Sequence, residues 1–200
     1  MPIQKGSASF SRFRVEAQKG HPKDLAKALR VKAFQPLEPA AQEERAQGFV
    51  ELGNKNLVEF APGDLYQGPF AIFAYRVDEV KIPSAAIKAE LEQWEQKFEA
   101  EHERKPGKKE KNDAKAELRH TLKSRYPLSS KSFEVSWHVE AGSVQLWAGS
   151  RKAVDEVQVA LEQAFAVKLI PVAPVTVAAE LGISEKSLSP TPQLSMPEEA

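Results

Sequence analysis

The residues of this chain that could do chemistry are mainly basic, and they are concentrated in one stretch. The chain carries 28 lysine and arginine residues against 28 aspartate and glutamate residues, so its net charge is zero. Between positions 104 and 131, only Glu110, Asp113 and Glu117 oppose the following basic residues: Arg104, Lys105, Lys108, Lys109, Lys111, Lys115, Arg119, Lys123, Arg125 and Lys131. Because charges elsewhere balance this block, we expect one positive face that attracts phosphate groups.

Five of these basic residues share a helical spacing. They recur every three or four positions, at Lys108, Lys111, Lys115, Arg119 and Lys123. This spacing places them on one face of a helix, which could either track the phosphates of a nucleic acid or form the solvated side of an exposed helix. Salt separates the first function from docking on an apolar surface, because only phosphate binding weakens steeply as salt rises. Reversal of Lys111, Lys115 and Arg119 to glutamate is expected to abolish only phosphate binding.

The sequence contains no convincing catalytic or metal-binding pattern. The chain has no cysteine, which excludes disulfides and thiolate zinc sites. Glu101, His102 and Glu103 form a compact string, but neighbouring residues on a helix do not converge on a metal ion. There is no phosphate-binding loop, no serine-nucleophile elbow and no metalloprotease helix motif. We therefore expect no enzymatic activity, no metal and no cofactor.

The first part of the chain shows both strand and helix patterns. Residues 8–16 alternate as in a strand, and residues 22–34 carry apolar residues at helical spacing. Short strands are predicted at 48–52 and 56–60. The aromatic and β-branched run at 69–77 is too apolar for an exposed edge and predicts a central strand.

The middle of the chain, residues 83–125, is predicted to form a long, protruding helical hairpin. Pro106 and Gly107 interrupt the helical pattern and allow the chain to reverse. Each helix has one apolar stripe, made of Ile87, Leu91, Trp94 and Phe98 in the first helix and of Ala114, Leu118 and Leu122 in the second. Trp94 and Phe98 are interpreted as packing residues.

A β-hairpin is predicted next, from strands at 132–140 and 143–148. Trp137 and Trp147 lie on these two strands and are interpreted as a pair of core aromatics. A helix at 151–166 and a strand at 168–172 follow. These elements together predict an α+β fold with an antiparallel-rich sheet packed by helices.

The predicted domain spans residues 1–174. Residues 175–200 are predicted to be an apolar patch, at 175–181, followed by a disordered tail rich in serine, proline and acidic residues. The sequence shows no signal peptide and no apolar run long enough to span a membrane. We therefore expect a cytoplasmic protein.

Several strings of this chain resemble the recombination-associated RdgC family. They are KIPSAAIKAELEQ at 81–93, EHERKPGKKEKNDAKAELRH at 101–120, and the order of hairpin, helix and strand from 132 to 174. The opening strand and helix fit as well, so the resemblance covers residues 8–174 and is strongest in the middle. The chain is shorter than the family's usual length, and it is expected to lack the portion that follows the last strand in the family.

The resemblance implies a non-enzymatic, nucleoid-associated homodimer that binds double-stranded DNA independently of sequence and restrains the RecA recombinase. The predicted DNA-binding residues are Arg104, Lys105, Lys108, Lys109, Lys111, Lys115, Arg119, Lys123, Arg125 and Tyr126. Tyr126 is the nearest equivalent of a family aromatic, a place that Pro127 could also take; it could contact DNA, pack in a dimer or close a turn. The alternative hypothesis is a protein-interaction module that docks a partner on the hairpin.

Overall fold

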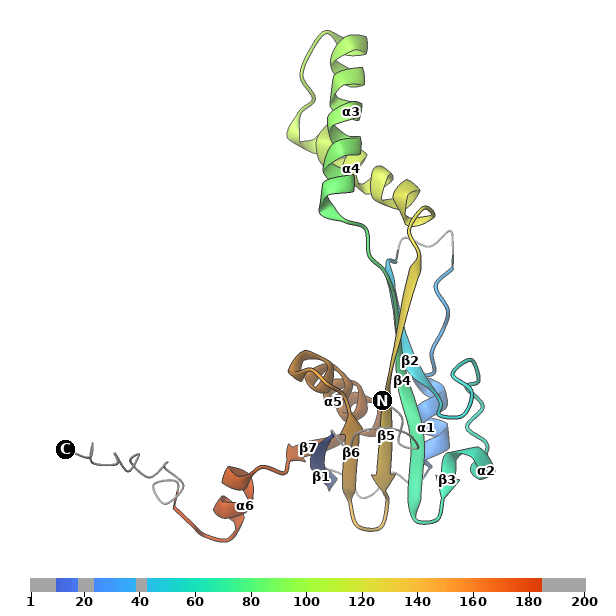
Figure 1. Cartoon of the computed structure of the whole chain (residues 1–200), viewed down its shortest axis with the longest axis vertical. Coiled ribbons are helices and arrows are strands. Elements are labelled where there is room, and N and C mark those ends of the chain that lie inside the picture. Colours follow the sequence, from blue (N-terminus) through green and yellow to red (C-terminus); the bar gives the residue numbers. More distant parts are fainter. Residues whose placement is uncertain (1–9, 18–23, 39–42, 185–200) are drawn as a thin grey trace, which may run out of the picture.

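The computed structural model describes residues 10–17, 24–38 and 43–184, and it confirms the α+β class (Figure 1). The strands are β1 (Ser11–Ala17), β2 (Arg45–Glu51), β3 (Tyr66–Gln67), β4 (Phe70–Val80), β5 (Leu128–His138), β6 (Ser143–Trp147) and β7 (Val167–Pro171). The helices are α1 (Leu25–Val31), α2 (Pro62–Leu65), α3 (Ser84–His102), α4 (Lys108–Lys123), α5 (Arg151–Phe165) and α6 (Pro174–Glu180).

The strands form one antiparallel sheet in the order β2-β4-β5-β6-β1-β7, and β3 pairs with the start of β4. β4 is an interior strand, as its apolar composition predicts. We call the sheet together with α1, α2 and α5 the body of the protein.

The main apolar core of the body lies between the sheet, α1 and α5. Alternate residues of β4 and β5 point to this face, where Phe73, Val135 and Trp137 are at most 1 % exposed. α5 contributes Val157, Leu161 and Phe165, which recur every four residues and therefore share one side of the helix. Burial of this apolar surface is the main force that holds the body together.

Capping side chains and a residue in the left-handed conformation set ends of α1 and α5, the two helices that cover the sheet. Asp24 accepts a hydrogen bond from the Lys27 N–H (2.9 Å) and so caps the start of α1. The hydroxyl of Ser150 accepts one from the Ala153 N–H (3.3 Å) and caps α5 in the same way. Ala166, with a left-handed φ of 51°, ends α5 and turns the chain into β7.

A smaller cluster packs on the other face of the sheet and explains why α1 is shorter than the predicted helix at 22–34. Residues 32–34 leave the helix and run beside β2, where the Phe34 N–H donates to the Phe49 carbonyl (2.9 Å). Gly48 permits this close approach, because a Cβ atom there would lie 2.5 Å from the backbone of Phe34. The buried residues of this cluster are Phe34, Val50 and Ala74.

The strand predicted at 56–60 is wrong. This segment is a loop that ends at Phe60, whose φ of 52° is incompatible with a strand. Phe60 is fully buried, so its apolar character serves the core without any strand pairing. The chain continues from this loop into the short elements α2 and β3.

The predicted core pair of Trp137 and Trp147 is also wrong. Trp137 lies opposite Val144 in the ladder, and its ring contacts Phe165 in the main core (4.9 Å between ring centroids). Trp147 lies opposite Glu134, three positions from Trp137 along β5, so it points to the other face of the sheet.

The apolar patch predicted at 175–181 largely forms α6, which sequence reasoning did not identify as a helix. Arg14 of β1 pairs with Glu180 at its end (2.5 Å). The tail predicted at 182–200 falls mostly at 185–200, outside the described residues. Within the described ranges, no helix is both long and apolar enough to cross a membrane.

Candidate nucleic-acid interface

β4 and β5 extend beyond β6 and carry the helical arm, by which we mean residues 83–125, and β2 accompanies β4 as far as Glu79 (Figure 1). The two strands pair along their whole length, from Phe70 opposite His138 to Val80 opposite Leu128. α3 begins just after β4 ends, and α4 ends just before β5 begins. The sheet therefore fixes the point at which both ends of the arm leave the body.

The arm contains both predicted helices, but a long hairpin of helices lying side by side is not confirmed. Lys111 of α4 pairs with Glu95 of α3 (2.8 Å), and Arg125 pairs with Glu90 (3.2 Å). Lys111 and Arg125 are 14 residues apart in the sequence, whereas their partners Glu95 and Glu90 are only five residues apart. The helices therefore cross obliquely, as Figure 1 shows.

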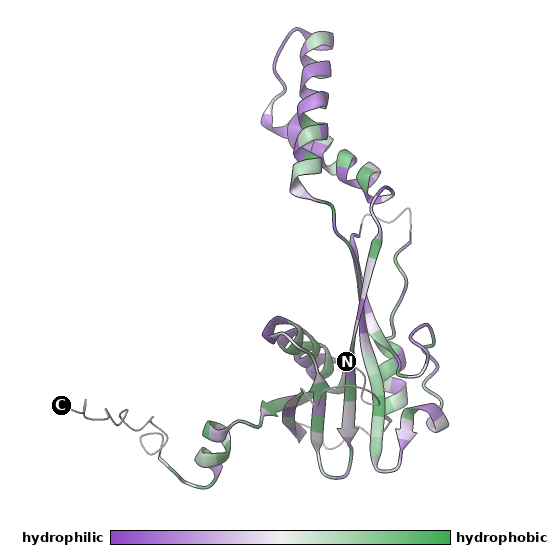
Figure 2. Ribbon diagram, viewed as in Figure 1, coloured by the Kyte–Doolittle hydropathy of each residue, from purple (hydrophilic) through white to green (hydrophobic). Residues whose placement is uncertain are grey.

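The apolar stripes of the two helices are used within the arm. Ile87, Ala114 and Leu122 are buried, and the half-buried rings of Trp94 and Phe98 contact each other (5.2 Å between centroids). Most of the remaining residues of the arm are hydrophilic (Figure 2). The arm thus has a thin apolar seam and a polar exterior.

An ion pair holds the turn between α3 and α4. Arg104 donates hydrogen bonds to both carboxylate oxygens of Glu110 (2.6 and 3.0 Å), and the Gly107 N–H donates to one of them (2.7 Å). The hydrogen bond from Arg104, aided by that of Gly107, lowers the pKa of Glu110 to about 2. The Arg104 guanidinium also lies over the Phe98 ring, 5.0 Å from its centroid.

Half of the predicted DNA-binding residues are engaged by the fold. Lys111 and Arg125 pair with glutamates of α3, and Arg104 pairs with Glu110 of α4. Arg119 pairs with Glu44 (3.8 Å), and the buried Lys123 donates to the Glu38 carbonyl (3.3 Å). The predicted stripe is therefore not a continuous row of free charges, because Lys111 faces α3 and Lys123 faces the body.

The other lysines among the predicted DNA-binding residues form what we call the basic edge. They surround the turn and the first half of α4, are exposed, and make no ion pair within the described part of the chain; they are Lys105, Lys108, Lys109 and Lys115. Tyr126 is half-buried beyond the other end of α4, so the structure separates it from this edge.

The two helices of the arm carry opposite charge. α3 is rich in glutamate, with Glu90, Glu92, Glu95, Glu99 and Glu101 against Lys88 and Lys97. The ion pairs to α4 neutralise Glu90 and Glu95 where the helices meet. The arm is thus polarised, and its positive side is the one that bears the basic edge.

The histidine and acidic residues of the arm do not form a metal site in the structure. The ring of His102 stacks on Phe98, with 4.2 Å between ring centroids. Across residues 10–17, 24–38 and 43–184, no group of three or more histidine, cysteine, aspartate or glutamate residues is arranged to hold a metal ion.

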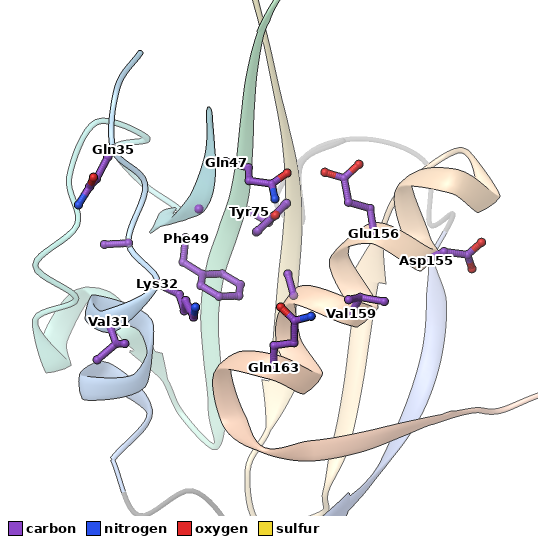
Figure 3. Close-up of a pocket in the computed structure, with 13 residues that line it drawn as sticks. Val31, Lys32, Gln35, Gln47, Phe49, Tyr75, Asp155, Glu156, Val159 and Gln163 are labelled. Carbon is purple, nitrogen blue, oxygen red and sulfur yellow. The ribbon is translucent and has the colours of Figure 1, made fainter. Parts of the chain in front are cut away.

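Sequence reasoning missed a groove of mixed polarity between α1 and α5, of about 720 Å³ (Figure 3). Phe49 and Tyr75 form its floor, and Val31 and Val159 are exposed along its lining. Burial, aided by the charge of Glu156, raises the pKa of Tyr75 to about 12, so its hydroxyl remains protonated at neutral pH. Val31 and Val159 lie off the buried stripes of α1 and α5, and this placement is the sequence pattern that could have indicated the groove.

Comparison with known proteins identifies one family. The family model described as "RdgC: Putative exonuclease, RdgC" matches residues 8–183 of the 200-residue chain. The matched range contains the whole sheet, the helical arm and α6. No curated protein matches the chain.

Proposed function

The chain belongs to the RdgC family, whose members have recombination-associated functions, and on this premise we propose that it binds the backbone of double-stranded DNA. The observation that carries the proposal is the basic edge, whose lysines are exposed and have no acidic partner among the described residues. The predicted DNA-binding residues that the fold engages, from Arg104 to Arg125, shape the arm and orient this edge.

The mechanism is electrostatic. Each lysine that neutralises a phosphate releases counterions and contributes about −0.9 to the slope of log affinity against log salt. Engagement of all lysines of the basic edge would give a slope of about −3 to −4. Contacts to phosphates carry no sequence information, so we expect binding that ignores base sequence.

We propose binding without cleavage, although the family description names an exonuclease. Two carboxylates near the basic edge are engaged in ion pairs, Glu110 with Arg104 and Glu95 with Lys111, which supports a structural use of these two groups. Incubation of an end-labelled duplex with the protein and Mg²⁺ or Mn²⁺ should leave the duplex intact. Progressive shortening of the labelled strand would overturn this part of the proposal.

The same family membership supports three further parts of the proposal: a homodimer, association with the nucleoid, and restraint of the RecA recombinase. Light scattering of the protein with and without duplex tests the dimer. RecA-dependent strand exchange, measured with increasing amounts of this protein, tests the restraint, and an unchanged rate would contradict it.

The decisive experiment compares two triple variants. Lys108→Glu/Lys109→Glu/Lys115→Glu reverses three lysines of the basic edge, whereas Lys27→Glu/Lys32→Glu/Lys168→Glu reverses three exposed lysines outside the arm and changes the net charge equally. The set chosen from sequence spacing is unsuitable, because Lys111 and Arg119 hold the arm in place. Affinity for a fluorescent duplex of arbitrary sequence is measured across a salt series.

We expect the first variant to lose about 100-fold or more in affinity at low salt and the second to lose less than about tenfold. Equal losses would show that only net charge matters. No binding by the wild-type protein at low salt would overturn the proposal.

The alternative of a protein docked on the arm has less support. It requires a free apolar stripe, whereas the stripe residues Ile87, Ala114 and Leu122 are buried and Leu91, Trp94, Phe98 and Leu118 are half-buried. Binding to a protein partner that persists at high salt and survives reversal of the basic edge would favour this alternative.

A further inference from the structure

A second basic site lies on the body, at the base of the arm. A cavity of about 340 Å³ opens there between β4, β5 and the first turn of α5. Its charged lining residues are Arg45, Lys81, Lys131 and Lys152 on the basic side and Glu79 and Glu156 on the acidic side. The cavity is therefore surrounded by more positive than negative charge.

Both acidic residues of the cavity already have basic partners. Arg45 pairs with Glu156, and Lys81 pairs with Glu79 (3.7 Å). Lys131 and Lys152 are exposed and have no ion pair with any residue that the structure describes. Two positive charges without a counter-ion thus line one cavity, although they come from β5 and α5.

The position of Lys152 is unfavourable for the fold alone. It follows Arg151 in the first turn of α5, which contains no acidic residue. The positive end of a helix dipole repels cations and favours anions. A bound anion would offset both this repulsion and the repulsion between the two lysines.

We propose that this cavity binds a phosphate group through Lys131 and Lys152. A lysine ammonium group attracts phosphate as a point charge. Both lysine side chains are exposed to solvent, so a phosphate of a nucleic-acid backbone can reach them. The assignment to a duplex phosphate rests on the proposed function.

The location suits a duplex that also contacts the arm. Lys131 lies opposite Val77, three pairs before the end of the β4–β5 ladder at Val80 and Leu128. At 3.3 Å per residue, Lys131 lies roughly 10 Å from the end of this ladder, where the chain leaves the sheet for the arm. One turn of duplex, about 34 Å long, exceeds this separation, so a duplex bound at the cavity would also pass the base of the arm.

The test compares the full-length chain with two double variants. Lys131→Gln/Lys152→Gln removes the two unpaired charges, and Lys27→Gln/Lys168→Gln removes two exposed lysines elsewhere. For a duplex of arbitrary sequence, the salt slope of the first variant should be shallower by about 0.9 to 1.8 than that of the control. Equal slopes, with wild-type binding intact, would overturn the inference and leave the proposed function standing.

A titration with inorganic phosphate, against chloride at equal ionic strength, tests the cavity without DNA. The backbone amide signals of Lys152 and Ala153 should shift saturably in the wild-type protein and not in the first variant. If the wild-type protein failed to bind duplex, saturable shifts would still support a phosphate site, and their absence would overturn it. Saturable shifts together with an unchanged duplex slope would overturn the duplex assignment and identify free phosphate as the ligand.

Discussion

The body and the helical arm differ in what holds them together. In the body, large aromatic side chains such as Phe49, Phe73 and Trp137 are at most 1 % exposed and contact one another or the Phe165 ring. In the arm, a thin apolar seam is supplemented by ion pairs between α3, α4 and the turn. Apolar burial responds little to salt, whereas exposed ion pairs are screened by it.

This difference places the proposed DNA contact on the part of the chain with the smaller core. Regions with few buried apolar residues open at low free energy, whereas core strands open only with the whole domain. Salt therefore acts on the arm twice, by screening the attraction of phosphates and by screening the ion pairs that shape the basic edge. Four substitutions test this difference between the body and the arm.

The largest loss is expected from Phe49→Ala in the body. Phe49 is fully buried and contacts the rings of Phe73, Tyr75 and Phe165. The cavity should lower the free energy of unfolding by about 3–5 kcal/mol in a urea titration. Val31→Ala, at a residue that is 73 % exposed, should change it by less than about 0.5 kcal/mol. Equal effects would contradict the placement of the core.

A smaller loss is expected from Asp78→Asn, which removes the negative partner of Arg76. Both carboxylate oxygens of Asp78 accept hydrogen bonds from Arg76 (2.9 and 2.8 Å), and the Asp78 side chain is 2 % exposed. We expect a loss of about 2–3 kcal/mol, below that of a fully buried pair because the Arg76 side chain is 17 % exposed. Asp113→Asn, an exposed residue of the arm, is the control.

The same pair makes the body sensitive to acid. Burial alone would raise the pKa of Asp78, but hydrogen bonds from Arg76 and Ser130 outweigh it and lower the pKa. A lowered folded-state pKa means that the stabilisation is complete above the unfolded value, about 4, and is lost as the pH falls through the folded value. Unfolding measured below pH 4 should show this loss in the wild-type protein, and the Asp78→Asn variant should lack this component.

Gly48→Ala should have a similar or smaller effect. The added Cβ would lie 2.5 Å from backbone atoms of Phe34, so residues 32–34 must move away from β2. We expect a loss of about 1–2 kcal/mol and faster hydrogen exchange of the Phe34 N–H. Gly53→Ala, where nothing lies within 4 Å of the new Cβ, should show no such exchange effect.

The smallest effect on global stability is expected from Glu110→Gln in the arm. Loss of the charge weakens the bond from Arg104, so amide exchange in the first turn of α4 should accelerate while the urea midpoint of the body stays the same. In the wild-type protein, the contribution of Glu110 is complete above its ordinary pKa of 4.5 and is lost as the pH falls through about 2. Carboxyl chemical shifts measure this titration directly, with Glu117→Gln as an exposed control. A large shift of the body midpoint would break the division between arm and body.

The sequence alone predicts those elements whose apolar residues are spaced so that they lie on one face. The four-residue steps of Val157, Leu161 and Phe165 locate α5, and the aromatic run of β4 locates a central strand. The loop at 56–60 was missed because the buried Phe60 mimics a strand pattern without any pairing. Trp147 was misplaced because its register against Glu134, which sets its face, depends on the length of the turn between β5 and β6.

The candidate site was predictable as a charged region but not as a set of free charges. Helical spacing shows which lysines share a face, but it does not show which partner faces them. Lys111 meets Glu95 only because α4 crosses α3, and Lys123 is buried only because the segment at Glu38 passes beside it. The cavity at Lys131 and Lys152 joins residues from β5 and α5, so no local pattern could indicate it.

The attachment of the arm to two neighbouring strands has a mechanical consequence. Traction on the arm pulls β4 and β5 in the same direction along their axes, because both leave the sheet at one end. The ladders to β2 and β6 are then loaded in shear, and their hydrogen bonds resist together instead of separating one after another. Tension transmitted through the arm from the proposed duplex would thus reach the centre of the sheet.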